Sequence, residues 1–130
     1  MKQAANFFKV WGGISGAQHL MPLLITLGHF DRQADLSLLL RFCSANVARR
    51  FKLPAGKGRI AAGSDADLAL VNLDENFDVR AADVHYRHRQ SPYVGRRLRG
   101  SVRRTLVRGQ TVCQDGQIVA KPQGWLVSPT

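Results

Sequence analysis

The sequence predicts an α/β protein with helices in its first half and strands in its second. Between Asp35 and Phe51 apolar residues recur every three or four positions, which is the spacing of an amphipathic helix. The segment 54–58, rich in proline and glycine, then ends this pattern. After it, short apolar runs alternate with turn residues, as strands and tight turns do. These three observations place the change from helix to sheet near residue 56.

A glycine-rich loop opens the first half. It reads Trp11-Gly12-Gly13-Ile14-Ser15-Gly16-Ala17-Gln18, and an apolar segment from His19 to Leu27 follows it. Glycines at this density allow positive φ angles and let the backbone come close to a ligand or to another strand. Where such a loop leads into a helix, the free backbone N–H groups of the first turn can bind an anion or a carbonyl oxygen. A plain tight turn would explain the same run.

Two helices are expected after this loop. The apolar positions between Asp35 and Phe51 share one face, and Ser44 and Asn46 interrupt the pattern. Either of these residues can cap a second short helix that runs to Leu53, because serine and asparagine side chains accept hydrogen bonds from first-turn N–H groups. The expected apolar face consists of Leu36, Leu39, Leu40, Cys43, Val47 and Phe51.

The second half is expected to form a small antiparallel sheet. Its strongest local signal is the Asp115-Gly116 pair between two apolar runs, because this dipeptide tolerates the positive φ angles of a two-residue hairpin turn. Other turns are expected at 63–65 and 108–110. The predicted strands cover 59–60, 66–73, 102–107, 111–113 and 118–119, with a loop and an edge strand at 74–79.

Asp65 and Asp67 raise the question of a metal or acid–base site. Aspartates beside glycine in a turn more often accept hydrogen bonds from nearby backbone N–H groups and hold the entry of a strand. We therefore predict a structural role for both carboxylates.

Composition limits the class of protein further. With 45% apolar and 22% charged residues the chain resembles folded globular proteins, while its 130 residues fall well short of the about 250 that a complete (β/α)8 barrel needs. The apolar stretch 20–27 is too short for a membrane-spanning helix, and the first residues lack a signal-peptide pattern, so a cytoplasmic location without membrane contact is expected. Cys43 and Cys113 show no metal-type spacing and no disulfide framework, and both are interpreted as small core residues.

The chain is strongly basic, with 19 Lys and Arg residues against 9 Asp and Glu residues and a formal charge of +10. Most of the excess lies between Arg87 and Arg108. Such a cluster is compatible with a nucleic-acid interface, but no helix-turn-helix, zinc or RNA-binding signature accompanies it. The preferred interpretation is that these arginines line the solvated face of a sheet or pair with acidic residues elsewhere in a larger protein, and no specific nucleic acid is expected as a partner.

Several motifs occur together in a specific order and spacing. Besides the loop at 11–18 they are Lys57-Gly58-Arg59-Ile60-Ala61-Ala62-Gly63-Ser64-Asp65-Ala66-Asp67-Leu68, Ser91-Pro92-Tyr93-Val94-Gly95 and the segment 105–112. Together they resemble the C-terminal part of an allantoinase-like cyclic amidohydrolase of the amidohydrolase superfamily, with dihydroorotases and hydantoinases as relatives. The residue pattern of this loop favours the resemblance to allantoinases, since hydantoinases usually have an Asn-Gly-x-x-Gly version of it.

This resemblance implies a fold and a site. Residues 1–56 would be the terminal loop and helices of a metal-dependent hydrolase TIM barrel, and residues 57–130 the C-terminal strands of its small composite β-sandwich domain. Enzymes of this superfamily hold zinc or another divalent metal with histidines, a lysine and an aspartate that lie before the point where this chain begins. We therefore expect no catalytic residue and no bound metal in this chain, because its histidines (His19, His29, His85 and His88) are not arranged to replace those ligands.

The resemblance also implies a substrate contact. It places Gly12, Gly13 and Ile14 near the substrate, with Ser15 and Gln18 behind them. The implied reaction is the hydrolysis of a small cyclic amide, first of all of allantoin to allantoate in purine catabolism. A dihydroorotase- or hydantoinase-type reaction is the alternative, and a basic nucleic-acid-binding β module is the alternative of another class.

The chain on its own is expected to be an inactive fragment. It would be a truncated gene product, one piece of a split enzyme or an incomplete gene model. Its expected partner is a complementary barrel fragment or a second copy of the chain, because the helical face at 35–51 and the edge of the sheet would otherwise lack their neighbours.

Overall fold

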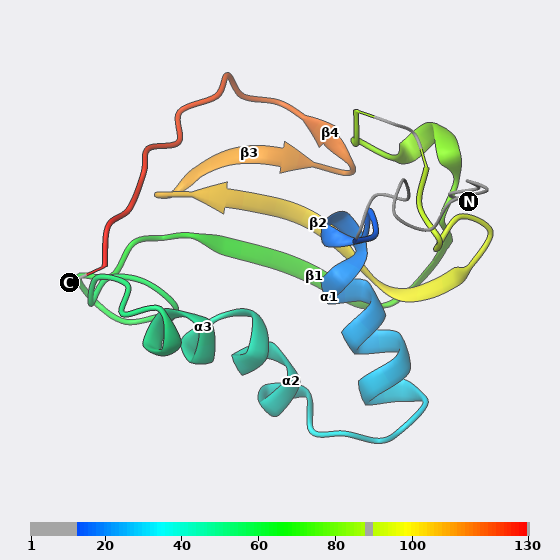
Figure 1. Cartoon of the computed structure of the whole chain (residues 1–130), viewed down its shortest axis with the longest axis horizontal. Helices are drawn as coiled ribbons and strands as arrows, with labels where there is room; N and C mark the ends of the chain where they lie inside the picture. Colours follow the sequence, from blue (N-terminus) through cyan, green and yellow to red (C-terminus); the bar gives the residue numbers. More distant parts are fainter. Residues whose placement is uncertain (1–12, 88–89, 130) are drawn as a thin grey trace, which may run out of the picture.

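The computed structural model describes residues 13–87 and 90–129. A four-stranded antiparallel meander in the order β1-β2-β3-β4 forms its centre. In Figure 1 the first helix crosses the β1 and β2 end of the sheet, while the second and third helices lie below β1 in the view. The elements are η2 (Ala17–His19), α1 (Leu20–Leu23), η3 (Leu24–Phe30), α2 (Leu36–Cys43), α3 (Ala45–Arg50), β1 (Leu68–Asp78), η4 (Ala81–Asp83), β2 (Arg97–Val107), β3 (Gln110–Gln114) and β4 (Gln117–Ile118).

The first helix continues from α1 into the wider π-helical turns of η3. Pro22 is tolerated in α1 because it lies in the first turn, where backbone N–H groups have no partner within the helix. The wider winding ends at Asp31, whose N–H donates to the Thr26 carbonyl at 3.0 Å, five residues back. Leu23 and Ile25 are buried on this helix and attach it to the sheet.

The helix contacts β2 at a glycine. A Cβ atom on Gly100 would lie 2.8 Å from Ile25 Cγ2, and the Gly100 φ angle is +91°, so only glycine allows this approach. Beside it, the Thr26 hydroxyl accepts a hydrogen bond from the Arg99 N–H at 2.8 Å. The same oxygen lies 3.0 Å from the Arg99 carbonyl and 2.8 Å from the Pro22 carbonyl, either of which can take its proton. This side chain therefore joins the helix to the strand backbone.

The buried core lies where this helix meets the sheet. Leu23, Val79 and Leu98 form it, and Leu27, Phe77 and Tyr93 pack against it half-buried. Leu98 is 2% exposed, and it faces the helix from β2. The core thus joins residues from the helical first half to residues that follow the first strand.

Both hairpin turns of the meander agree with the sequence-based predictions. Asp115 and Gly116 have φ angles of +48° and +77°, and Arg108 and Gly109 have φ angles of +47° and +80°. Two consecutive positive φ angles define the two-residue turns that match the twist of adjacent strands.

One strand prediction was confirmed in part and one was wrong. The edge strand expected within 74–79 is present, because β1 lies at the edge of the sheet and continues through irregular pairing to Asp78 opposite Arg97, but no separate loop precedes it. Residues 59–60 form no strand, and the Ile60 side chain is 90% exposed. The segment 57–67 lies in turns instead, because Lys57 Nζ binds the carboxylates of Asp65 and Asp67 and closes the segment on itself.

The predicted helix pair is confirmed, with its break at Ser44. Asp35 caps α2 by accepting a hydrogen bond from the Leu38 N–H at 2.8 Å. Ser44, one of the two predicted candidates, is the N-cap residue of α3, but its side chain makes no cap hydrogen bond, because its hydroxyl donates back to the Leu40 carbonyl at 2.8 Å. In addition, α3 ends at Arg50 rather than at residue 53, where Lys52 turns the chain with a φ angle of +51°.

Candidate functional site

The candidate site is the glycine-rich loop that precedes the first helix. Gly13 has a φ angle of +76°, and nothing lies within 4 Å of the position of a Cβ atom there. The Ile14 side chain is 68% exposed. Two of the residues predicted to meet a substrate are therefore at the surface of the described part, while Gly12 lies outside the described residues.

The other side of this loop is held by the segment between η4 and β2. The Ser91 hydroxyl donates to the Ser15 carbonyl at 2.7 Å. The ring of Tyr93 lies against Gly16, where a Cβ atom would stand 3.0 Å from Tyr93 Cε2. The sequence placed Ser15 behind the exposed residues, but it did not pair the loop with the Ser91-Pro92-Tyr93 motif, because that contact spans 76 residues of chain.

The chemistry available at Gly13 and Ile14 is limited to binding. Neither side chain titrates or attacks as a nucleophile, and Gly13 leaves its backbone uncovered by a side chain. Such a loop can shape the wall of a pocket and present backbone groups to a ligand. It cannot transfer a proton or form a covalent intermediate.

Next to this loop lies a buried histidine that the sequence did not single out. His19 is 5% exposed, and its Nδ1 has no hydrogen-bond partner within residues 13–87 and 90–129. Burial lowers the pKa of His19, because it disfavours the charged imidazolium. The residue lines an open groove of about 770 Å³ between α1 and the sheet, whose walls also include Phe77 and Arg103.

The histidines of the described part do not converge on a common point. His29 Nδ1 lies 2.9 Å from the Ala34 carbonyl, and His85 Nε2 lies 3.1 Å from the Gly116 carbonyl. His88 lies outside the described residues. In the two described segments no three His, Cys, Asp or Glu side chains are grouped so that they could hold a metal ion. These residues therefore do not fit a metal centre.

Several arginines of the cluster make contacts within the chain. Arg99 pairs with Asp74 at 3.2 Å and stacks over the Phe30 ring at 3.7 Å. Arg103 pairs with Glu75 at 3.1 Å and with Asp115 at 2.7 Å. The sequence expected such arginines either to line the solvated face of a sheet or to pair with acidic residues elsewhere in a larger protein. Arg99 and Arg103 lie on β2 with partly exposed side chains, as the first alternative expects, and they pair with acidic residues of the neighbouring strand and of the hairpin turn.

The last arginine of the cluster holds the C-terminal segment. Arg108 Nη2 donates to the Gln123 carbonyl at 2.7 Å, and its guanidinium lies 3.6 Å from the centre of the Trp125 ring. A guanidinium over an indole face is attracted by the ring quadrupole. This arginine therefore fastens residues without regular structure to the β2–β3 turn.

Asp65 and Asp67 have the structural role that their sequence context predicts. Asp67 Oδ1 accepts a hydrogen bond from the Arg108 N–H at 2.8 Å, and both carboxylates bind Lys57 Nζ. Lys57 and this N–H lower the pKa of Asp67, and the two carboxylates raise the pKa of Lys57. The cluster thus holds the entry of β1 against the β2–β3 turn.

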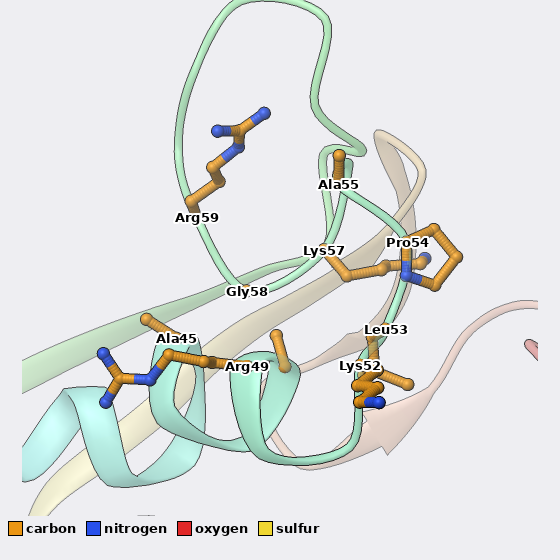
Figure 2. Close-up of a pocket in the computed structure, with 10 residues that line it drawn as sticks. Ala45, Arg49, Lys52, Leu53, Pro54, Ala55, Lys57, Gly58 and Arg59 are labelled. Atoms are coloured by element: carbon orange, nitrogen blue, oxygen red, sulfur yellow. The ribbon is translucent and has the colours of Figure 1, made fainter. Parts of the chain in front are cut away.

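A second hollow, of about 270 Å³, lies between α3 and the segment 52–59. Its walls carry Arg49, Lys52, Lys57 and Arg59, a set that would suit an anion if the head groups converged. Figure 2 shows instead that the Arg49 and Arg59 guanidinium groups point away from one another. Lys57 is already bound by two carboxylates. This hollow is therefore no anion site.

A model of the amidohydrolase family matches residues 5–113 of the chain. An allantoinase from Rubrobacter xylanophilus is 50% identical over 129 residues, which are 99% of this chain and 28% of that protein. An allantoinase from Desulfitobacterium hafniense is 45% identical over 95% of this chain and 27% of its own length. The chain thus spans little more than a quarter of the length of these relatives.

Solved structures of related proteins show the same arrangement of elements. An L-hydantoinase (dihydropyrimidinase) from Arthrobacter aurescens superposes with a TM-score of 0.82 at 28% identity, over 89% of this chain and 26% of that chain. A D-hydantoinase (dihydropyrimidinase) from a Thermus species superposes with a TM-score of 0.83 at 28% identity, over 88% and 25% of the two chains.

Proposed function

The chain belongs to the amidohydrolase family, and we propose that it supplies the C-terminal part of an allantoinase, an enzyme that hydrolyses allantoin to allantoate. The observation that carries this proposal is the 50% identity to the Rubrobacter xylanophilus allantoinase over almost the whole chain. The exposed, neutral loop at Gly13 and Ile14 supports a substrate-binding contribution. A divalent metal such as zinc would be held by the remaining part of the enzyme.

In this proposal the chain has two parts. Residues 1–56 end the catalytic barrel, and residues 57–130 complete a small β domain. The complete enzyme works in the cytoplasm on a small cyclic ureide. Its other part, or a further copy of this chain, covers the helical face of α2 and α3 and the free edge of β1. We expect the chain alone to have no hydrolase activity, because residues 13–87 and 90–129 hold no group of side chains that could bind a metal ion.

A chimera tests the proposal. The 129-residue segment of the Rubrobacter xylanophilus allantoinase that matches this chain is replaced by this chain, and allantoin hydrolysis is measured with and without a metal chelator. We expect chelator-sensitive hydrolysis by the chimera and none by the isolated chain. A folded chimera that does not hydrolyse allantoin would contradict the proposal, and so would hydrolysis by the isolated chain.

The loop is tested by a matched pair of glycine substitutions in the chimera. Gly13 and Gly63 have φ angles of +76° and +78°, and neither has an atom within 4 Å of its Cβ position, so alanine costs about 1 kcal/mol of backbone strain at both. We expect Gly13→Ala to raise KM for allantoin about tenfold and Gly63→Ala to leave KM unchanged. Equal KM values for the two variants would remove the loop from the substrate site.

A hydantoinase or dihydropyrimidinase reaction is the second candidate. It is supported by the solved structures that superpose on the chain with TM-scores of 0.82 and 0.83. Hydantoin, dihydrouracil and dihydroorotate therefore serve as competing substrates in the chimera assay. A kcat/KM for one of them above that for allantoin would favour this candidate.

A further inference from the structure

The Gln18 side chain pairs with a backbone segment 65 residues away. Its Nε2 donates to the Asp83 carbonyl at 2.8 Å, and its Oε1 accepts from the His85 N–H at 2.9 Å. A carbonyl and an N–H two residues apart on one segment are the groups that a neighbouring strand would engage. The side-chain amide thus replaces a strand partner and uses both its donor and its acceptor.

The same short segment binds the loop and the hairpin on either side of it. The Tyr86 hydroxyl accepts a hydrogen bond from the Gln18 N–H at 2.7 Å, so residue 18 is held through its backbone as well. The imidazole of His85 contacts the Gly116 carbonyl at 3.1 Å in the β3–β4 turn. Val84, which lies between Asp83 and His85, is 4% exposed and anchors the segment in the interior. The glycine-rich loop is therefore tied to buried structure through residue 18.

This anchor matters because the loop has little rigidity of its own. Gly13 and Gly16 lack the side chains that restrict backbone angles, and ordering such residues costs more conformational entropy than ordering others. The loop enters the helical turns at η2, where the His19 N–H donates to the Gly16 carbonyl at 3.1 Å. Gln18 lies within this turn, four residues after Ile14.

We propose that Gln18 is a positioning residue that sets the conformation of the 13–16 loop by pairing its side-chain amide with Asp83 and His85. That the ordered loop faces a substrate rests on the proposed function, whereas the positioning itself does not. Gln18 touches no reacting atom in this scheme. It acts through the loop that it holds.

Hydrogen exchange of the chain tests the positioning directly. The amides of Gln18, His19 and His85 are bonded within this network and report on it. We expect Gln18→Ala to speed the exchange of all three about tenfold while the exchange of β2 amides stays unchanged. Gln18→Glu keeps an acceptor for the His85 N–H but places an oxygen against the Asp83 carbonyl. The amide of His85 should therefore stay protected from exchange, while the amides of residues 18 and 19 lose protection.

The matched control is Arg80→Ala. Arg80 pairs with the Asp83 carboxylate at 2.7 Å, so this variant disturbs the same segment without touching the amide pairing. Its exchange at positions 18, 19 and 85 should equal that of the wild type. Unchanged exchange in Gln18→Ala, or equal loss in Arg80→Ala, would overturn the positioning role.

A kinetic readout separates this inference from the proposed function. In the active chimera, Gln18→Ala should raise KM for allantoin about tenfold with kcat reduced less than threefold, since a looser loop weakens binding before it affects chemistry. A fall in kcat at constant KM would contradict a role through the loop. If the unmutated chimera is inactive, the proposed function fails, and the exchange experiment alone still decides whether residue 18 positions the loop.

Discussion

His19 and Thr26 are polar side chains in the first helical region that differ in whether hydrogen bonds compensate their burial. The Thr26 hydroxyl bonds to the Arg99 N–H on β2, so its burial is compensated. The His19 ring is buried more deeply, and its Nδ1 has no partner within the described ranges. An unsatisfied buried polar atom costs about 1–3 kcal/mol, so His19 destabilises the described structure.

The first prediction concerns the pH dependence of stability at His19. Because burial lowers its pKa below 6.5 in the folded chain, the unfolded chain binds a proton more readily. Above about pH 6.5 the ring is neutral in both states, so it does not lower the free energy of unfolding by protonation. As the pH falls through that value toward the lower folded pKa, the unfolded chain takes up the proton first and stability is lost. We expect the melting temperature of the wild type to drop in this window.

The variant His19→Leu should remove this part of the pH dependence. Its melting temperature should exceed that of the wild type, and the difference should grow between about pH 7.5 and about pH 5. His29→Leu serves as the control, because it removes a half-buried histidine while His19 remains, and it should keep the acid-induced drop. A pH-independent difference between His19→Leu and the wild type would refute the assignment.

At the scale of elements, close packing is concentrated at glycines. Gly100 lets the first helix approach β2, and Gly58 lets the segment after α3 approach that helix. A Cβ atom on Gly58 would lie 2.6 Å from the Ala48 Cβ and 3.1 Å from the Ser44 carbonyl oxygen. Gly58 also has a φ angle of +76°, so both sterics and backbone conformation require glycine there.

The second prediction is that Gly58→Ala destabilises the chain by about 2–4 kcal/mol, the sum of backbone strain and overpacking against α3. Gly63→Ala, with a φ angle of +78° and open space around it, should cost only about 1 kcal/mol. Urea unfolding of the two variants measures the difference. Adding Ala48→Gly should restore part of the stability lost in Gly58→Ala but none of that lost in Gly63→Ala. Equal losses in the free energy of unfolding for the two glycine variants would show that α3 does not crowd residue 58.

Element boundaries were predictable where local chemistry decides them. The break between α2 and α3 follows from an interrupted apolar pattern, and the Asp115-Gly116 hairpin follows from residues that accept positive φ angles. An edge strand was expected within 74–79, but its continuity with the strand before it was not, because the second half of β1 is acidic and polar. That half becomes a strand because Arg99 and Arg103 on β2 pair with Asp74 and Glu75.

For the whole molecule, the main feature is the amount of exposed apolar surface. The predicted apolar face of α2 and α3 contains one buried leucine, Leu39, whereas Phe51 is 62% exposed. None of the helices in the described part combines the length and apolar character needed to cross a membrane. Large exposed apolar residues on α2, α3 and the residue that follows are Leu38, Leu40, Phe42, Val47 and Phe51. Apolar surface of this kind is typical of a contact face.

The third prediction is that the isolated chain self-associates. Each large apolar side chain removed from water contributes about 1.5–3 kcal/mol, which rivals the net stability of a small domain when several are involved. Sedimentation velocity should show species larger than the monomer, and a hydrophobic dye should bind. Phe42→Ser and Phe51→Ser together should shift the chain toward monomer without loss of helix, whereas Leu39→Ser should unfold it. A monomer that melts sharply and binds no dye would contradict this prediction.

The sequence by itself determined the order of helices and strands, the positions of the hairpin turns, the structural role of Asp65 and Asp67 and the family of the chain. The helices and the hairpin turns depend on residues that are neighbours along the chain, so local patterns report them. The role of the two aspartates was predicted from their turn context, although Asp67 also bonds to the Arg108 N–H, 41 residues away. The sequence also placed Ser15 and Gln18 behind the exposed loop, although only through the resemblance to that family.

Only the tertiary structure decided what holds the loop and where the core lies. The contacts of Ser15 with Ser91 and of Gln18 with Asp83 join residues more than 60 positions apart, and no local pattern encodes such a pairing. The burial of His19 likewise follows from the approach of the first helix to the sheet. The physical reason is the same in each case: hydrogen bonding and exclusion of water depend on which distant segments meet, and that is settled only when the chain has folded.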